Sequence, residues 1–305
     1  MTHRQGAALM LVCTLLWSLS GVVTRQLETA RGFEVAFWRS FFTTLTLTAL
    51  LAWPGGVRAL WTRIRAGGAS QWWSAACWAV MFTAFMLALT MTTVANVLVT
   101  LALTPLLTAL VARLAIGHRL ALHTVVAIVA AAAGLAWMFG SELRGAGPRE
   151  LAGVAIAASV PLCAAINWTL LQHVARRADS PGADMLPSVL LGAAGAMLLS
   201  LPAALPLSAV PADIAWLALL GVVQLAVPCL LAVQVSRVLS APEIALYSLL
   251  EVIFGVSWVW LAGGESPSPA VLGGGGLVLT ALVMNEWLGA RHAGATLRGR
   301  GAGAG

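Results

Sequence analysis

Charged side chains are scarce in this sequence. They make up 9% of its 305 residues. Lysine is absent, so the seventeen lysine and arginine positions are all arginine. A soluble domain carries about 25% charged residues, so this composition excludes one. Hydrophobic residues reach 60%, the mean hydropathy is +0.92, and apolar runs of about 20 residues, the length of a membrane-spanning helix, recur along the chain. The sequence therefore predicts an all-α polytopic membrane protein.

Residues that catalyse reactions or hold metals are also sparse. The five histidines are scattered near loops or chain ends, and neither an HExxH motif nor a pair of aspartates is present. The four cysteines lie inside apolar runs without the spacing of a metal site, so we expect thiols that pack as small hydrophobes. We therefore expect no catalytic residues, no metal and no cofactor. An intramembrane enzyme is the least favoured alternative.

The arginine positions predict an orientation in the bilayer rather than a nucleic-acid partner. The net charge of +6 comes from arginines in short loops. Between them lie ten apolar runs that we predict as membrane-spanning helices: residues 6–25, 34–53, 71–91, 93–115, 121–140, 151–175, 185–205, 212–237, 241–262 and 269–288. With the N-terminus in the cytoplasm, twelve arginines fall on the inner side and four on the outer side. The positive-inside rule therefore predicts that both termini are cytoplasmic.

The two halves of the chain align at an offset of 147 residues. Gly6 falls on Gly153 and Gly117 on Gly264, and the first five predicted helices fall on the last five. Because five is odd, the second half crosses the membrane in the opposite sense. The sequence thus predicts an inverted repeat of the kind used by many secondary transporters. Its five-helix units are residues 1–147 and 148–290, followed by a disordered cytoplasmic tail at 291–305. Two repeats in one chain allow a monomer to function.

Several short motifs accompany this repeat. The fourth predicted helix contains Pro105 and ends near Gly117, and the second half carries Gly264-Glu265. Further motifs are Leu16-Trp17-Ser18 and Phe37-Trp38-Arg39. In these features the sequence resembles the EamA-type ten-helix branch of the drug/metabolite transporter superfamily over residues 6–288. It departs from the family pattern at His118, where a glutamate is usual, and at Val252, where a proline is usual.

The resemblance implies a function and a location. Members of this branch export small metabolites, often amino acids, from the bacterial cytoplasm across the inner membrane. The motifs belong to the scaffold and identify no substrate. Composition and periodicity alone leave an uncoupled facilitator or channel as an alternative to a carrier.

Polar residues share one face of the fourth and ninth predicted helices. They are four residues apart, at Asn96, Thr100 and Thr104 and, 147 positions later, at Glu243, Tyr247 and Glu251. An acid at the centre of an apolar helix costs about 2.5–3.5 kcal/mol on insertion scales. Glu251 is therefore either a proton- or cation-binding group on the translocation path or a structural acid bonded to a neighbour such as Gln224 or Tyr247.

Arg39 lies about five residues inside the second predicted helix. We favour snorkelling of its side chain to the outer interface. The alternative is a gate ion pair or an anchor for a substrate carboxylate.

Tryptophans deep inside helices predict a central cavity, since a buried indole N–H needs a partner or a cavity to face. Lipid-facing packing is the alternative. Helices one, three, four, six, eight and nine are expected to enclose this cavity. The predicted lining residues are Trp17, Ser20, Trp78, Phe82, Thr100, Thr104, Asn167, Trp168, Gln224, Tyr247, Ser248 and Glu251. Kinks at Pro105, Pro161 and Pro228 serve either gating or static bends. With few charges, such a site suits small neutral or zwitterionic solutes.

Overall fold

The structure is a computed structural model, and it describes residues 1–92, 97, 100–101, 103–117, 121–139, 147–177, 184–261, 269, 272–281, 283–285 and 287–288. Within these ranges every regular element is helical. Four predicted features lie outside them, namely Asn96, His118, the Gly264-Glu265 pair and the tail 291–305.

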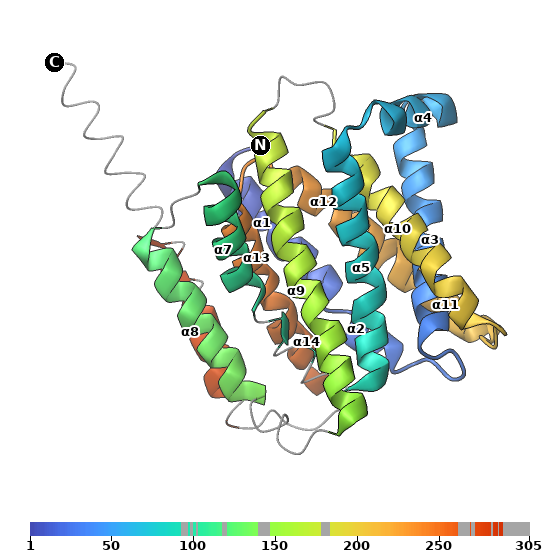
Figure 1. The fold of residues 1–305 in the computed structure, drawn as a ribbon. Helices are drawn as coiled ribbons and strands as arrows, with labels where there is room; N and C mark the ends of the chain where they lie inside the picture. Colours follow the sequence, from blue (N-terminus) through green and yellow to red (C-terminus); the bar gives the residue numbers. More distant parts are fainter. Residues whose placement is uncertain are drawn as a thin grey trace.

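The helices form one bundle (Figure 1). In chain order they are α1 (His3–Trp17), α2 (Ser20–Thr24), α3 (Phe33–Ala52), α4 (Gly56–Ala66), α5 (Ala69–Met91), α7 (Thr104–Ile116), α8 (Leu122–Phe139), α9 (Pro148–Ala175), α10 (Leu186–Ala204), α11 (Pro211–Leu219), the π-helix η1 (Leu220–Ala226), α12 (Val227–Val235), α13 (Ala241–Ser248) and α14 (Leu250–Leu261). Helix α4 lies across one end of the bundle, at the same end as the N-terminus.

Six helical segments are long and apolar enough to cross a membrane. They are His3–Thr24, Phe33–Ala52, Ala69–Met91, Pro148–Ala175, Leu186–Ala204 and Pro211–Val235, and they match the first, second, third, sixth, seventh and eighth predicted helices. Shorter apolar helices stand at the fourth, fifth and tenth positions, at Thr104–Ala115, Leu122–Gly134 and Leu272–Asn285. The chain is therefore an integral membrane protein of helical fold.

Three predicted helices are interrupted near the middle of the bundle. The first breaks at Ser18 and Leu19, between α1 and α2, and the ninth breaks at Leu249, between α13 and α14. The eighth widens into η1, and Pro228 follows directly after it. Proline has no N–H, so Pro228 leaves the carbonyl of Gln224 without its α-helical donor. Such π-helical turns are frequent at functional sites.

The other two prolines that were predicted as kinks lie in regular helix. Pro161 is inside α9, a helix of 28 residues that continues past the proline without a break. Pro105 is in the first turn of α7, where a missing N–H removes no helical hydrogen bond.

Glycines allow the closest helix contacts around the centre. A Cβ atom on Gly192 of α10 would lie 2.3 Å from the Cβ of Trp78, and one on Gly221 of η1 would lie 2.6 Å from the Arg39 carbonyl oxygen. Each contact excludes any larger residue. These two glycines therefore allow α10 to pack directly on Trp78 and η1 on the backbone of Arg39.

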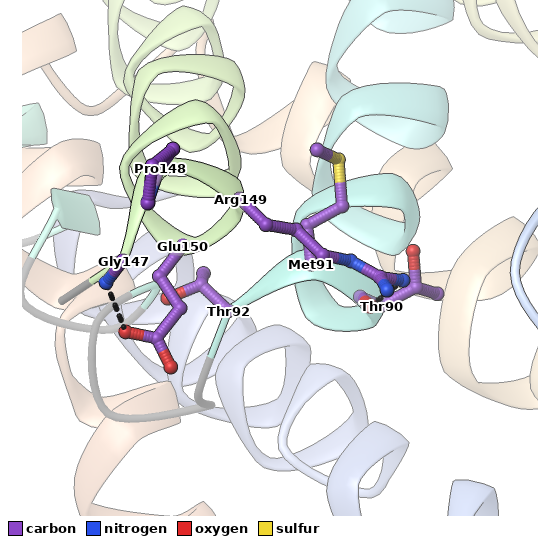
Figure 2. A pocket seen from close by; sticks show the side chains of 7 residues that line it. All are labelled: Thr90, Met91, Thr92, Gly147, Pro148, Arg149 and Glu150. Atoms are coloured by element: carbon purple, nitrogen blue, oxygen red, sulfur yellow. Dashed lines mark hydrogen bonds between the residues drawn. The ribbon is translucent and has the colours of Figure 1, made fainter.

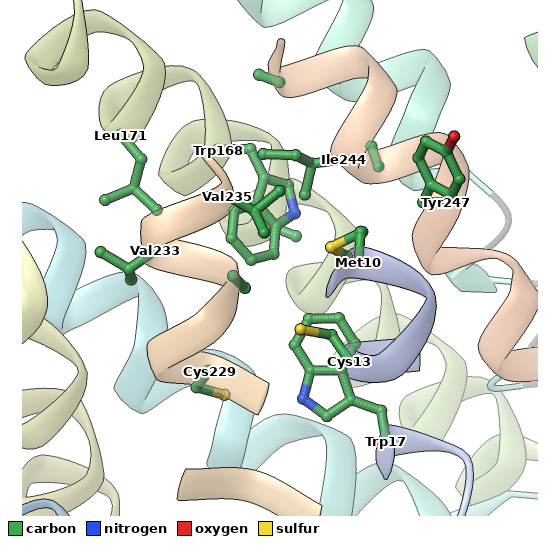
Figure 3. Packing of buried hydrophobic residues seen from close by; sticks show 14 of the residues in the cluster. Met10, Cys13, Trp17, Trp168, Leu171, Cys229, Val233, Val235, Ile244 and Tyr247 are labelled. Carbon is green, nitrogen blue, oxygen red and sulfur yellow. The ribbon is translucent and has the colours of Figure 1, made fainter. Parts of the chain in front are cut away.

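The buried core extends along α1, α9, α12 and α13. Met10, Cys13, Trp168, Cys229 and Tyr247 are among its members, all less than 9% exposed (Figure 3). All four cysteines are free, and three are buried while the fourth is half-buried. The thiols therefore pack as expected from the sequence.

Candidate functional site

A cavity of about 110 Å³ lies inside the bundle, close to the helix interruptions. Its lining residues come from both halves of the chain: Trp17, Arg39, Trp78, Met81, Phe82, Phe85, Leu101, Thr104, Val160, Ala164, Trp168, Gln224, Leu225, Cys229, Ser248 and Glu251. Sites for drug-sized ligands measure about 300–1,000 Å³. In this form the cavity therefore fits only a small solute.

Aromatic rings form one wall of the cavity. Trp78 is 1% exposed, and its ring centroid lies 5.3 Å from that of Phe82 and 5.4 Å from that of Trp168, edge to face with the latter at 85°. This arrangement is among the favourable geometries for aromatic pairs. The indole N–H of Trp78 has no hydrogen-bond partner among the described residues. The wall is thus a rigid apolar surface that holds an unused donor.

Arg39 lines the cavity from α3 and is only 2% exposed. Its Nη2 donates to the carbonyl oxygen of Phe82 at 2.9 Å. Thr43 binds α3 to η1, because its Oγ1 donates to the Arg39 carbonyl at 2.7 Å and to the Gly221 carbonyl at 3.0 Å. The interpretation that Arg39 snorkels to the outer interface is therefore wrong. The hydrogen bond to Phe82 keeps this guanidinium in the interior, and Gly221 lets η1 pack close to the Arg39 backbone.

Glu251 lines the cavity from the first turn of α14 and is partly exposed. Where the structure describes the chain, ion pairs within 4.0 Å join His3 to Glu243 and Arg63 to Asp184, so Arg39 and Glu251 do not pair directly. The cavity thus holds one basic and one acidic side chain that remain apart.

Gln224 projects from η1 into the same wall. Its Nε2 donates to the Trp17 carbonyl at 3.1 Å, where α1 ends. Its Oε1 has no hydrogen-bond partner among the described residues. The lining of the cavity thus includes an amide whose oxygen is buried and is left unused by the described residues.

The structure brings most of the predicted lining residues together. Those in the lining are Trp17, Trp78, Phe82, Thr104, Trp168, Gln224, Ser248 and Glu251, together with Arg39. Those outside it are Ser20, Thr100, Asn167 and Tyr247, together with Pro105, Pro161 and Pro228.

A hydrogen bond explains why Asn167 lies outside the lining of the cavity. Its Oδ1 accepts a hydrogen bond of 2.6 Å from Ser74, whose hydroxyl also lies 2.9 Å from that of Ser188. These side chains are buried between α5, α9 and α10. Asn167 therefore links α9 to α5, at a serine that also contacts α10.

Several lining residues were missed from the sequence. Leu101, Val160, Ala164, Leu225 and Cys229 carry no polar or aromatic signal that sets them apart from other apolar residues of a membrane helix. Only the fold identifies them.

Hydrogen bonds close the bundle at the end where α3 begins. Asp213 is 0% exposed and accepts from the backbone N–H groups of Glu28, Thr29 and Ala30 at 2.8, 2.9 and 2.8 Å, and from Thr29 Oγ1 at 2.8 Å. In return, Glu34 of α3 accepts from three donors of the other loop: the N–H groups of Ser208 and Ala209 at 2.7 and 2.8 Å, and Ser208 Oγ at 2.8 Å. Each acid thus holds the loop that precedes the other acid's helix.

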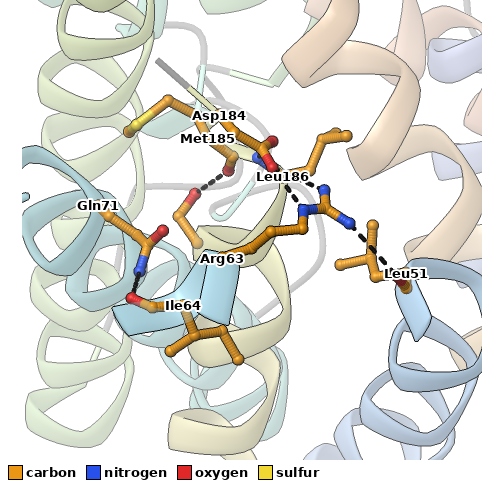
Figure 4. Close-up of polar contacts among 8 residues, drawn as sticks. Leu51, Arg63, Ile64, Gln71, Asp184, Met185 and Leu186 are labelled. Atoms are coloured by element: carbon orange, nitrogen blue, oxygen red, sulfur yellow. Dashed lines mark hydrogen bonds and ion pairs between the residues drawn. The ribbon is translucent and has the colours of Figure 1, made fainter. Parts of the chain in front are cut away.

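The opposite end, where α3 finishes, is joined by an ion pair. Arg63 of α4 donates to Asp184 Oδ2 at 2.7 Å and to the Leu51 carbonyl at 3.2 Å (Figure 4). Gln71 donates to the Ile64 carbonyl beside it at 2.9 Å. The two charged side chains are about a third exposed, at 32% and 38%. This end therefore has weaker links than the other.

A second, more open depression of about 630 Å³ lies between the ends of α5 and α9 (Figure 2). Its lining residues run from Thr90 to Thr92 and from Gly147 to Glu150. Glu150 accepts from the Gly147 N–H at 3.1 Å, and Arg149 reaches the Thr90 carbonyl at 3.5 Å. Its charged groups are thus engaged locally, and the less open cavity inside the bundle is the better candidate site.

Comparison with known proteins agrees with this architecture. Residues 4–140 match the model of the EamA-like transporter family, which confirms the resemblance inferred from the motifs. Of the solved structures, 25 chains match. One, described as "Crystal structure of protein", is 17% identical, has a TM-score of 0.72, and the match covers 94% of this chain and 98% of that one. At that identity the likeness shows the fold alone. None of the curated proteins compared with the chain matches it.

Proposed function

We propose that this chain, whose residues 4–140 belong to the EamA-like transporter family, is a secondary transporter that exports amino acids or similar small neutral or zwitterionic solutes across the bacterial inner membrane. The observation that carries the proposal is the cavity inside the bundle, where interrupted helices meet between an aromatic wall and two opposite charges. Discontinuous helices at the middle of the membrane are typical of substrate sites in secondary transporters.

The transporter works by alternating access between two inverted five-helix repeats, residues 1–147 and 148–290. Helix spacing supports this part of the proposal. Helix α7 begins at Thr104 and α14 at Leu250, and the difference of 146 residues (250 − 104) is within one residue of the sequence offset. Two helix starts are thus separated by nearly the repeat offset, which supports a relation between the halves.

Both termini lie in the cytoplasm in this proposal. The N-terminus is at the same end of the bundle as α4 (Figure 1), and α4 carries Arg58, Arg63 and Arg65. A basic amphipathic helix at the inner surface agrees with the positive-inside rule.

A counterflow assay tests transport. Proteoliposomes are loaded with millimolar unlabelled amino acid, one amino acid per preparation, and labelled amino acid is added outside at micromolar concentration. A carrier accumulates label transiently above equilibrium because it exchanges solutes, whereas a channel only equilibrates. Protein-free liposomes are the control for leakage.

Two results would contradict the proposal. Equilibration without an overshoot identifies a facilitator or channel. Failure of every proteinogenic amino acid to enter faster than in protein-free liposomes removes amino acids as the substrate class.

A further inference from the structure

The guanidinium of Arg39 has binding capacity that the protein leaves unused. A guanidinium is charged at all physiological pH values and offers five N–H donors. One hydrogen bond goes from Nη2 to the Phe82 carbonyl at 2.9 Å, while Nε has no partner among the described residues. The side chain is nevertheless only 2% exposed and lines the cavity. A buried arginine without a bound anion is costly, so this group is suited to receive one.

The anion that best fits an arginine is planar and carries two oxygens. Carboxylates accept two parallel hydrogen bonds from one guanidinium, and such charge-assisted bonds are roughly twice as strong as neutral ones. Phosphates fit the same fork, but their additional charge would need more cations. Among the described residues that line the cavity, Arg39 is the only basic one. A single carboxylate therefore matches this charge.

The cavity also holds groups that would bind a cation. Glu251 lines it without a direct ion pair to Arg39, and Gln224 presents an Oε1 that has no partner among the described residues. Both groups accept hydrogen bonds, as an ammonium requires. A ligand with one carboxylate and one ammonium would leave the site at zero net charge, which avoids an uncompensated charge in a medium of low dielectric constant.

We infer that Arg39 binds the carboxylate, and Glu251 with Gln224 the ammonium, of a free α-amino acid whose side chain packs on Trp78, Phe82 and Trp168. This inference rests on the proposed function and narrows its substrate class. A volume of about 110 Å³ restricts this form of the cavity to small amino acids. Amides, which lack the carboxylate, and deaminated acids, which lack the ammonium, are rejected because each leaves one charged side chain of the cavity unpaired.

Binding measured by isothermal titration calorimetry on the purified full chain in detergent tests the inference without transport. The probes are L-alanine, L-serine and L-threonine, the carboxamide of each, and the deaminated acid of each. We expect the amino acid to bind at least about tenfold more tightly than either analogue, because a site built for a polar group strongly rejects a ligand that lacks it.

Two variants assign the contacts. Arg39→Gln should abolish the preference for the amino acid over its amide. Glu251→Gln should abolish the preference for the amino acid over its deaminated acid. Arg39→Lys should restore part of the first preference, because lysine keeps the charge but not the fork. Ser200→Ala is the matched control, since Ser200 is equally buried but donates to the Ala196 carbonyl of its own helix at 2.7 Å. It should bind as the unsubstituted chain does.

The unsubstituted protein keeps the inference falsifiable if a variant fails to fold. Equal affinity for an amino acid and its amide would overturn it, and so would a folded Arg39→Gln that retains the preference. Counterflow with these amino acids separates the two ideas. If amides inhibit counterflow as well as amino acids do, the inference is refuted and the proposed function stands. Selective binding without exchange refutes transport alone. No binding of any probe refutes the inference.

Discussion

The carboxylate of Asp213 should be a major source of stability, and Asp213→Asn tests this. Asp213 accepts four hydrogen bonds from residues 28 to 30 at 2.8–2.9 Å. An amide keeps only one oxygen. In its better orientation that oxygen faces the three donors on Thr29 and Ala30, and the new NH₂ group faces the Glu28 N–H. Two donors then face each other, and the partly buried N–H of Glu28 loses its acceptor.

The cost follows from these contacts. An unsatisfied buried donor costs about 1–3 kcal/mol, and the three remaining bonds lose their charge assistance. Part of this loss is offset because burying an amide costs less than burying a carboxylate. The expected decrease in the free energy of unfolding is about 2–5 kcal/mol. At about 2 °C per kcal/mol for a large domain, the melting temperature should fall by about 4–10 °C.

Thermal unfolding in detergent, followed by tryptophan fluorescence at a fixed scan rate, measures this difference. Glu150→Gln is the matched control, because Glu150 also lies in the first turn of a helix but accepts a single bond of 3.1 Å. That variant should melt within about 2 °C of the unsubstituted chain, since such contacts contribute about 0.3–1 kcal/mol. If Asp213→Asn melts with the control, the reasoning fails.

Three further predictions concern the cavity and the opposite end of the bundle. Gly221→Ala should destabilise the protein by about 1–3 kcal/mol and weaken amino-acid binding, because the new methyl displaces the Arg39 backbone at 2.6 Å. Calorimetry that finds unchanged affinity would refute that link. Arg63→Gln should lower stability by less than about 1 kcal/mol, since its ion pair with Asp184 is partly exposed; a fall in melting temperature of more than about 4 °C would contradict this. In a chain whose other cysteines are alanine, N-ethylmaleimide should label Cys229 slowly, and bound amino acid should slow labelling further because Cys229 lines the cavity. Labelling that ligand leaves unchanged would contradict that placement.

Two kinds of feature could be predicted from the sequence: periodic apolar runs, and polar or bulky residues whose place inside a membrane helix costs free energy. Six predicted helices coincide with helices long enough to span a membrane. Trp17, Trp78 and Trp168 do line a cavity, because an indole deep in an apolar helix is a strong signal. Glu251 was found for a similar reason, since an acid there is expensive.

Other features depend on contacts between distant segments. Arg39 was placed at the interface because its burial depends on partners on other helices, such as the Phe82 carbonyl and the close approach of Gly221, which give no local signal. Asn167 looked like a lining residue, but its face is set by Ser74 of another helix. The break at Ser18 was also not predicted. The Ser18 hydroxyl accepts a hydrogen bond of 2.8 Å from the Trp258 indole, which belongs to a distant segment. The carboxylates of Asp213 and Glu34 join two loops whose proximity only the fold establishes.

The opposite charges of Arg39 and Glu251 have a consequence for the energetics of transport. A single elementary charge that crosses the bilayer experiences about 2.3 kcal/mol of work per 100 mV. When Glu251 is ionised, the work on its negative charge and the work on the positive charge of Arg39 have opposite signs and sum to zero. The empty carrier would then reorient at a rate independent of membrane voltage, and a zwitterionic cargo would not change that. Under the proposed function, an energised cell then exports solute without drawing on its electrical gradient.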